Sequence, residues 1–214
     1  MQIDRSAPPP AFKVSLATTY DNHASERDDR GEAAWRHPAR DAFLAEMQAE
    51  GRTRLLEIGA GTGHTARWFA DQGLDVVATD LSPDQVETCR EKGLEADLRD
   101  FYELGFAPAS FDGAWAANCL LHVPNVHLAG GLEHIAAVLF DRGLFSVALW
   151  GGVSAEGSYE DDCFLPPRFF AFRSDDAVRE LLATTFTIED FSVLHPDEAG
   201  DRYLHVQSMV LRKP

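Results

Sequence analysis

A glycine-rich turn between two short apolar segments constrains the fold more than any other feature of this sequence. Residues 55–80 read LLEIGAGTGHTARWFADQGLDVVATD, with glycine at positions 59, 61 and 63. Such a turn, placed where a strand ends and a helix begins, lets the backbone approach a ligand without side-chain clash. A tight turn with no ligand is the alternative, which the entropic cost of three alternating glycines disfavours. The segment predicts a nucleotide-like ligand.

The acidic residues near the turn favour one class of nucleotide-like ligand over another. A nicotinamide or flavin dinucleotide fingerprint, G-x-G-x-x-G, needs glycine at position 64, which is His64. Glu57 is a poor neighbour for a pyrophosphate but a good partner for a cationic group. Asp80, which ends the next apolar segment, can accept both hydroxyls of an unphosphorylated ribose. S-adenosylmethionine, with a ribose, an ammonium and a sulfonium, fits these requirements.

Strand and helix patterns alternate from residue 53 to residue 194. This alternation predicts an α/β fold with a doubly wound, mostly parallel, seven-stranded sheet and an antiparallel last strand. Helix signals include Ser82 and Ser174 as N-caps, whereas residues 151–173 have no clear period and predict an irregular excursion. We expect a flexible arm (1–12) and a single domain (13–214), divided into a helical cap (13–51), a cofactor-binding core (52–150), a substrate-side insertion (151–173) and a last helix with two strands joined by a hairpin (174–214).

Four motifs in order resemble the class I S-adenosylmethionine-dependent methyltransferase superfamily, particularly its small-molecule branch. They are LLEIGAGTG, VVATDLSPDQVETCREKG, EADLRDF and FDGAWAANCLLHVPN. The resemblance implies a Rossmann-like fold and a set of residues around the cofactor S-adenosyl-L-methionine and its product S-adenosyl-L-homocysteine. In that set Glu57, Gly59, Ala60, Gly61, Asn118 and Cys119 lie near the methionine part, Asp80 holds the ribose, and Leu81, Asp97 and Leu98 contact the adenine.

Methyl transfer needs alignment of the acceptor and exclusion of water, and it needs a base only when the acceptor carries a proton. His122, just past the fourth strand, is the best-placed titratable residue for that role, since its unperturbed pKa lies near neutrality. Packing or hydrogen bonding beneath the cofactor is the alternative. Cys119 lacks the preceding proline of enzymes that attack cytosine, so a buried small side chain is expected there.

Substrate selection, by the same resemblance, falls to the cap and to the segment after the fifth strand. Aromatic residues and arginines there predict an apolar pocket wall, with Arg168 as an anchor for a carboxylate; packing of the phenylalanines onto the sheet edge is the alternative. The expected substrate-binding residues are Tyr20, Arg27, Trp35, Trp150, Arg168, Phe169 and Phe170.

The charge and the cysteines narrow the function further. A net charge of -16 argues against nucleic acid and anionic membrane surfaces, and no apolar stretch is long enough to span a bilayer or to serve as a secretory signal. Three scattered cysteines favour a reducing cytoplasm, and no metal-site spacing is present. The sequence favours a cytoplasmic, monomeric or homodimeric enzyme that methylates an O, N or C atom of a small molecule. A tRNA or protein methyltransferase and a nonenzymatic S-adenosylmethionine-binding protein are the alternatives.

Overall fold

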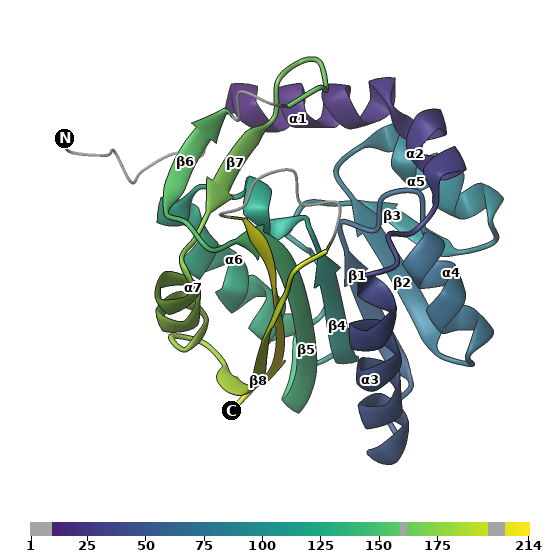
Figure 1. Ribbon diagram of the computed structural model, residues 1–214. Coiled ribbons are helices and arrows are strands. Elements are labelled where there is room, and N and C mark those ends of the chain that lie inside the picture. The colour runs from purple at the N-terminus through teal and green to yellow at the C-terminus, as the bar shows by residue number, and fades with distance from the viewer. Residues whose placement is uncertain (1–9, 159–161, 197–203) are drawn as a thin grey trace.

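The computed structural model describes residues 10–158, 162–196 and 204–214, and they form a seven-stranded sheet with helices on both faces (Figure 1). The strand order is β3-β2-β1-β4-β5-β9-β8. β9 runs antiparallel to both neighbours, β5 and β8, while the pairings among β1 to β5 are parallel. The predicted fold class is therefore confirmed, although the antiparallel strand lies inside the sheet and β8 forms its edge. The strands are β1 (Arg54–Ile58), β2 (Asp75–Asp80), β3 (Glu95–Leu98), β4 (Phe111–Ala117), β5 (Leu139–Gly151), β8 (Thr187–Leu194) and β9 (His205–Arg212).

Alternating side chains of the central strands supply two separate core layers. Leu55 packs on one face of β1 and Leu56 on the other, and both are fully buried. The first face is covered by α3 (Arg36–Ala49), α4 (His64–Asp71) and α5 (Pro83–Glu91), and the second by α6 (Asn125–Val138) and α7 (Asp175–Leu182) (Figure 1). Burial on both faces explains why these strands read as continuous apolar runs.

Two helix starts have the cap geometry that the sequence predicts. The Ser82 hydroxyl accepts a hydrogen bond from the Gln85 amide at the start of α5, and the Ser174 hydroxyl accepts one from Ala177 at the start of α7. Each cap satisfies a backbone donor that has no partner within the helix, which places the helix start.

The first helix begins earlier in the sequence than expected. α1 (Pro10–Asn22) begins inside the predicted arm, because a proline is well tolerated in the first turn of a helix. Residues 1–9 lie outside the described part of the chain. α1 and α2 (Ala24–Arg30) cross the end of the molecule beyond the carboxyl ends of the parallel strands (Figure 1).

The expectation of an irregular segment at 151–173 is wrong in part. β6 (Ala155–Ser158) and β7 (Phe169–Phe172) pair antiparallel as a second, two-stranded sheet, with Glu156 opposite Ala171. Phe170, Ala171 and Phe172 are all buried, so β7 lacks the alternating pattern that identifies a half-exposed strand. β8 and β9 pair as predicted, while most of the segment that joins them, residues 197–203, lies outside the described residues.

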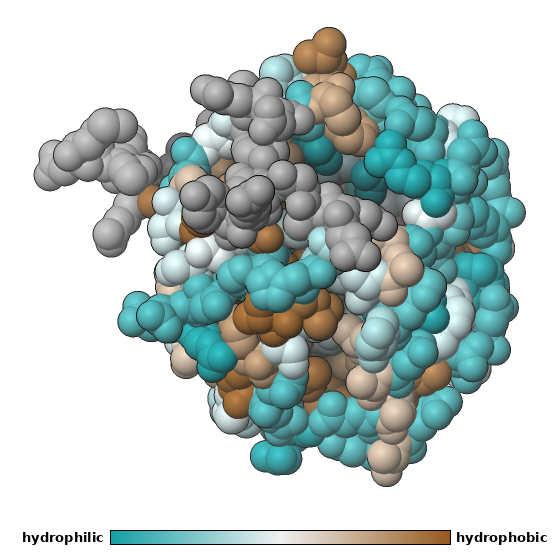
Figure 2. All heavy atoms as spheres, in the orientation of Figure 1, coloured by the Kyte–Doolittle hydropathy of each residue, from teal (hydrophilic) through white to brown (hydrophobic). Residues whose placement is uncertain are grey.

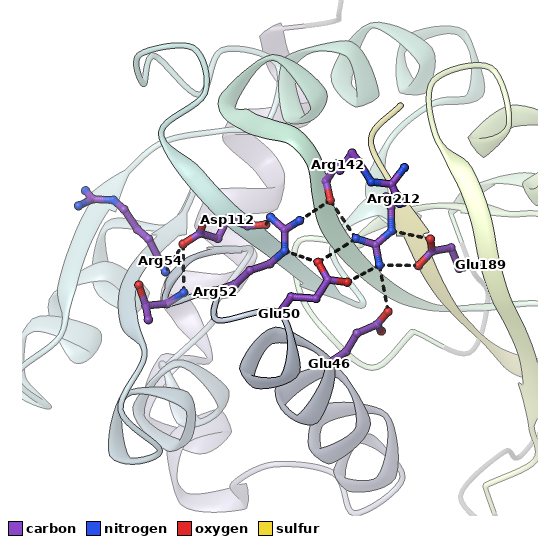
Figure 3. A network of polar contacts seen from close by, with 9 residues as sticks. Glu46, Glu50, Arg52, Arg54, Asp112, Arg142, Glu189 and Arg212 are labelled. Atoms are coloured by element: carbon purple, nitrogen blue, oxygen red, sulfur yellow. Dashed lines mark hydrogen bonds and ion pairs between the residues drawn. The ribbon is translucent and has the colours of Figure 1, made fainter.

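A polar network ties the last strand to the cap helix α3 (Figure 3). The Arg212 guanidinium, whose side chain is 8% exposed, donates to the carboxylates of Glu46, Glu50 and Glu189 and to the Arg142 carbonyl. Hydrogen bonds from Arg212 and then from Arg52 lower the pKa of Glu50 to about 2. This network joins four separate segments at the end of the sheet where β5 and β8 begin, since Arg212 lies opposite Leu144 and Thr187.

Hydrophilic residues cover most of the face shown in Figure 2, in keeping with the large excess of acids. Within the described ranges, no helix has both the length and the apolar character that crossing a membrane requires.

Candidate active site

The glycine turn after β1 lies against two other segments, the one after β4 and helix α5. A Cβ atom added to Gly59 would lie 2.3 Å from Cβ of Cys119, and one added to Gly63 would lie 2.8 Å from Sγ of Cys89. Both glycines have positive φ, +67° and +80°. Glycine is thus required at 59 for contact with the segment after β4 and at 63 for contact with α5.

A cavity of about 260 Å³ opens at the carboxyl ends of β1, β2, β4 and β5. Open α/β sheets bind ligands at this edge. Among the residues expected at the site, the lining includes Gly59, Ala60, Gly61, Asp80, Leu81, Asn118, Cys119, His122, Tyr20, Arg27, Trp150, Arg168 and Phe170. The cap and the strand ends thus enclose one space.

Asp80 shapes the cavity through the backbone. Its Oδ2 accepts from the Gly61 amide at 2.9 Å, and its Oδ1 accepts from the Ser82 amide at 3.0 Å. Burial raises the pKa of the Asp80 carboxyl, and the backbone amides oppose that shift. Each carboxylate oxygen has more than one acceptor site, so Asp80 can still accept hydrogen bonds from a ligand.

Glu57 lies just outside the cavity lining and is 3% exposed. Its Oε2 atom is buried without a hydrogen-bond partner, and burial raises its pKa to about 8, against the opposing charge of Arg36. A buried carboxyl without a partner is costly, and a cationic ligand would lower that cost.

Two arginines of the cap line the cavity without a carboxylate partner. Among the described residues, neither Arg27 nor Arg36 has a carboxylate oxygen within 4.0 Å, and the Nε atom of each is buried without a hydrogen-bond partner. Burial lowers the pKa of Arg36, and the charge of Glu57 opposes that shift. Arg27 was among the substrate-binding residues expected from the sequence. Two guanidinium groups without a carboxylate partner can bind an anionic group.

The segment after β4 supplies a polar atom and an unreactive thiol. Asn118 has a φ of +59°, and its Oδ1 atom is buried without a partner. The Cys119 thiol donates to the Ile58 carbonyl at 3.1 Å, and burial raises its pKa to about 12. A thiol in that state is no nucleophile at neutral pH.

Of the three residues expected to contact adenine, Leu81 lines the cavity, whereas Asp97 and Leu98 are not part of its lining. Asp97 pairs with Arg99, with 2.9 Å between Oδ2 and Nε, and Leu98 is 56% exposed. The lining here comes from the next residues along the chain, Arg99, Asp100, Phe101 and Tyr102. Phe101 and Tyr102, the aromatic pair that follows the third strand, are the signal in the sequence for this part of the lining.

His122 is buried and makes hydrogen bonds through both ring nitrogens. Nδ1 lies 2.7 Å from the Phe169 carbonyl oxygen, and Nε2 lies 2.6 Å from the Tyr20 hydroxyl. Burial lowers the pKa of His122 to about 3, with smaller contributions from the charges of Arg168 and Arg27. A neutral imidazole with both nitrogens engaged is poorly suited to take the acceptor's proton directly, contrary to the expectation from the sequence.

Arg168 lines the cavity, but its charge is already paired. It donates to both oxygens of Asp162, with 2.7 Å between Nη2 and Oδ1, and the Asp162 side chain is 1% exposed. The expectation that Arg168 is a free anchor for a carboxylate is therefore corrected by this buried ion pair.

Some of the expected aromatic residues line the cavity, and others pack elsewhere. Phe170 lines the cavity and also belongs to the hydrophobic core. Phe169 contributes its carbonyl to His122, and its ring is outside the lining. Trp150 lines the cavity with Trp35 packed edge-on behind it, at 6.4 Å between ring centroids.

The part of the chain that contains the glycine turn and strands β1 to β4 is similar to a known protein family. Residues 55–143 match the methyltransferase domain family. The chain is 32% identical over 104 residues to methyltransferase GfsG of Streptomyces halstedii, and 30% identical over 96 residues to the ubiquinone biosynthesis O-methyltransferase of Xylella fastidiosa. These alignments cover 44% and 42% of the chain but only 37% and 39% of the two relatives.

The fold comparison covers nearly the whole chain. The crystal structure of Burkholderia thailandensis 1,6-didemethyltoxoflavin-N1-methyltransferase, with bound 1,6-didemethyltoxoflavin and S-adenosylhomocysteine, is similar with a TM-score of 0.77 and 27% identity. The match covers 97% of this chain and 91% of that one. The similarity therefore extends over the cap and the insertion as well as the sheet.

Proposed function

Because this chain belongs to the class I S-adenosylmethionine-dependent methyltransferase superfamily, we propose that it is an enzyme that transfers a methyl group from S-adenosylmethionine to a small molecule. The observation that carries the proposal is the cavity at the carboxyl ends of the strands, where unpartnered buried polar atoms meet the glycine turn. These atoms are the groups that a zwitterionic nucleoside would satisfy.

The methionine part of the cofactor suits the polar groups near the turn. Its ammonium would face the buried carboxyl of Glu57 and the Oδ1 atom of Asn118, and its carboxylate would face the guanidinium of Arg27 or Arg36. A buried polar atom without a partner costs free energy, so each such contact favours the bound state.

The ribose and adenine suit the neighbouring strand ends. Asp80 is held by two backbone amides, which orient its remaining acceptor sites toward the cavity. Leu81 lies beside it in the lining, and Phe101 and Tyr102 offer ring faces to a base. The roles of Asp97 and Leu98 at the adenine stay a prediction.

The cofactor supplies an electrophilic methyl group, and the chain's residues bind, orient and shield the reactants. α1 and the β6–β7 hairpin meet over the cavity, where Thr19 donates to the Pro166 carbonyl at 2.6 Å. Enclosure of this kind excludes water and holds the acceptor in line with the methyl group.

A small-molecule acceptor is supported by the cavity and by two of the similar proteins, one named for N1-methylation of 1,6-didemethyltoxoflavin and the other for O-methylation in ubiquinone biosynthesis. The net charge of -16 disfavours tRNA as a substrate. The cysteines Cys89, Cys119 and Cys163 are free, which supports a reducing compartment such as the cytoplasm.

Calorimetry with S-adenosylmethionine, S-adenosylhomocysteine and NAD tests the proposal. We expect micromolar binding of the first two, about -7 to -9 kcal/mol, and no binding of NAD. Asp80→Ala should weaken both ligands by the same factor, because the ribose is common to them. A screen of metabolites for production of S-adenosylhomocysteine would then identify the acceptor. Tight NAD binding without S-adenosylmethionine binding would reject the proposal.

A further inference from the structure

The direction of each hydrogen bond around His122 follows from the chemistry of its partners. The Phe169 carbonyl only accepts, so Nδ1 of His122 must carry the proton. A neutral imidazole then has Nε2 as an acceptor, and the pKa of His122, lowered to about 3 by burial, keeps the ring neutral. The Tyr20 hydroxyl must therefore donate its proton to Nε2, at 2.6 Å.

This arrangement leaves the Tyr20 oxygen as an acceptor in the cavity. A phenol has one proton to donate and two lone pairs to accept with. The proton is used by His122, and one lone pair is approached by Nη1 of Arg168 at 3.4 Å. The other lone pair can accept a hydrogen bond from a ligand.

The charges and aromatic rings around Tyr20 indicate the chemical class of that ligand. Arg168 is neutralised by Asp162, and Arg27, whose guanidinium carbon lies 5.0 Å from the centroid of the Tyr20 ring, is one of the two arginines assigned to the carboxylate of the cofactor. When the cofactor binds through Arg27, neither of these two cations is left over for an anionic acceptor. The rings of Tyr20, Phe170 and Trp150 line the same space, and the guanidinium plane of Arg168 lies over the Phe164 ring at 4.1 Å. Flat apolar walls suit a flat apolar molecule.

We propose that the methyl acceptor is an uncharged aromatic compound whose hydroxyl or ring N–H donates a hydrogen bond to the Tyr20 oxygen, with His122 acting as the positioning residue that orients the Tyr20 hydroxyl. The inference rests on the proposed function and deepens it, because it names the chemical class of the acceptor and the group that recognises it. Tyr20 contacts the acceptor, whereas His122 acts only through Tyr20.

The test uses three compounds that share one ring system. 2-Naphthol has a hydroxyl donor, 2-methoxynaphthalene has none, and 2-naphthoate is an anion. Binding of each to the protein saturated with S-adenosylhomocysteine is measured by calorimetry. We expect 2-naphthol to bind roughly fivefold more tightly than the methoxy compound, the worth of one neutral hydrogen bond, and 2-naphthoate to bind most weakly.

Variants separate recognition from folding. Tyr20→Phe should abolish the preference for 2-naphthol over 2-methoxynaphthalene, while Tyr102→Phe, which removes the same hydroxyl from another lining residue, should retain it. His122→Leu should reduce the preference, and His122→Gln should restore part of it, because an amide can donate to Phe169 and accept from Tyr20. Melting temperatures identify any variant that merely unfolds.

Two results would overturn the inference. The first is a wild-type protein that shows no preference for 2-naphthol, or that keeps the preference in Tyr20→Phe. The second is tightest binding of 2-naphthoate, which would mean that Arg168 or Arg27 is available to an anionic acceptor. Failure of S-adenosylhomocysteine itself to bind would instead contradict the proposed function, so the two ideas fail separately.

Discussion

Gly59 and Cys119 lie so close that a Cβ atom at position 59 would stand 2.3 Å from Cβ of Cys119. The contact joins the turn after β1 to the segment after β4, the two segments that form one wall of the cavity. A side chain at 59 would force these segments apart, because distances under 3.0 Å are not tolerated between such atoms.

Gly59→Ala should therefore destabilise the protein and weaken cofactor binding together. Gly73→Ala is the matched control, since Gly73 has a φ of +92° and no atom within 4 Å of a Cβ. We expect about 1 kcal/mol for the control, from φ strain alone, and roughly 2 to 3 kcal/mol more for Gly59→Ala. Stability is measured by urea unfolding. When Cys119→Gly is added to the Gly59→Ala variant, it should recover most of the extra loss of about 2 to 3 kcal/mol, because the clashing side chain is then gone. Equal losses in the two glycine variants would contradict the close contact.

Glu57 should make the stability of the ligand-free protein fall as the pH rises. Its pKa in the folded state, about 8, lies above the ordinary glutamate value of 4.5, so the folded protein binds the extra proton between those values. Its contribution to stability is complete below pH 4.5 and is lost as the pH rises through 8. Relative to Glu57→Gln, the wild-type protein should lose roughly 2 to 4 kcal/mol between pH 5 and pH 8. Parallel stability curves from urea unfolding would refute this.

The same carboxyl should release a proton when the cofactor binds. At pH 7 the buried Glu57 is protonated without a ligand, and an adjacent ammonium favours its ionised form. Calorimetry of S-adenosylhomocysteine binding in buffers of different ionisation enthalpy should detect close to one proton released, and Glu57→Gln should release fewer. An identical proton count in both proteins would remove Glu57 from the ammonium site.

Asp97→Asn should weaken cofactor binding by about 1 to 3 kcal/mol if Asp97 accepts from the adenine amino group. S-inosylhomocysteine, in which a carbonyl replaces that group, should bind the wild-type protein and the variant alike. Asp100→Asn is the informative comparison, because Asp100 lines the cavity and pairs with Lys13 at 2.7 Å. A selective loss in Asp100→Asn alone would move the adenine contact from Asp97 to Asp100.

Arg212→Gln should lower the free energy of unfolding by about 2 to 4 kcal/mol, because it leaves three carboxylates without their shared cation (Figure 3). Arg67→Gln is the control, since Arg67 forms only an exposed pair with Asp71 within one helix. Its cost should stay within about 0.5 kcal/mol. Urea denaturation measures both, and similar values would mean that the network adds no more than a surface pair.

Much of the fold could be predicted from local features of the sequence. The limits of β1 and β2, the caps at Ser82 and Ser174, and the glycine turn were predictable, because each depends on residues that are neighbours in the sequence. The order of elements then indicated the doubly wound sheet, since parallel strands need helical crossovers. β7 was missed because its burial depends on what packs against it, and a strand buried on both faces has no alternating pattern.

The chemistry at the acceptor end of the cavity depended on tertiary structure. The sequence by itself determined that a histidine, a tyrosine and an arginine were available near the site. Only the fold brought Tyr20, which is 102 residues from His122, within 2.6 Å of its ring, and only the fold buried Asp162 against Arg168. Burial and partners decide whether a side chain is charged, neutral or already paired, and those depend on packing between distant segments rather than on the residue type.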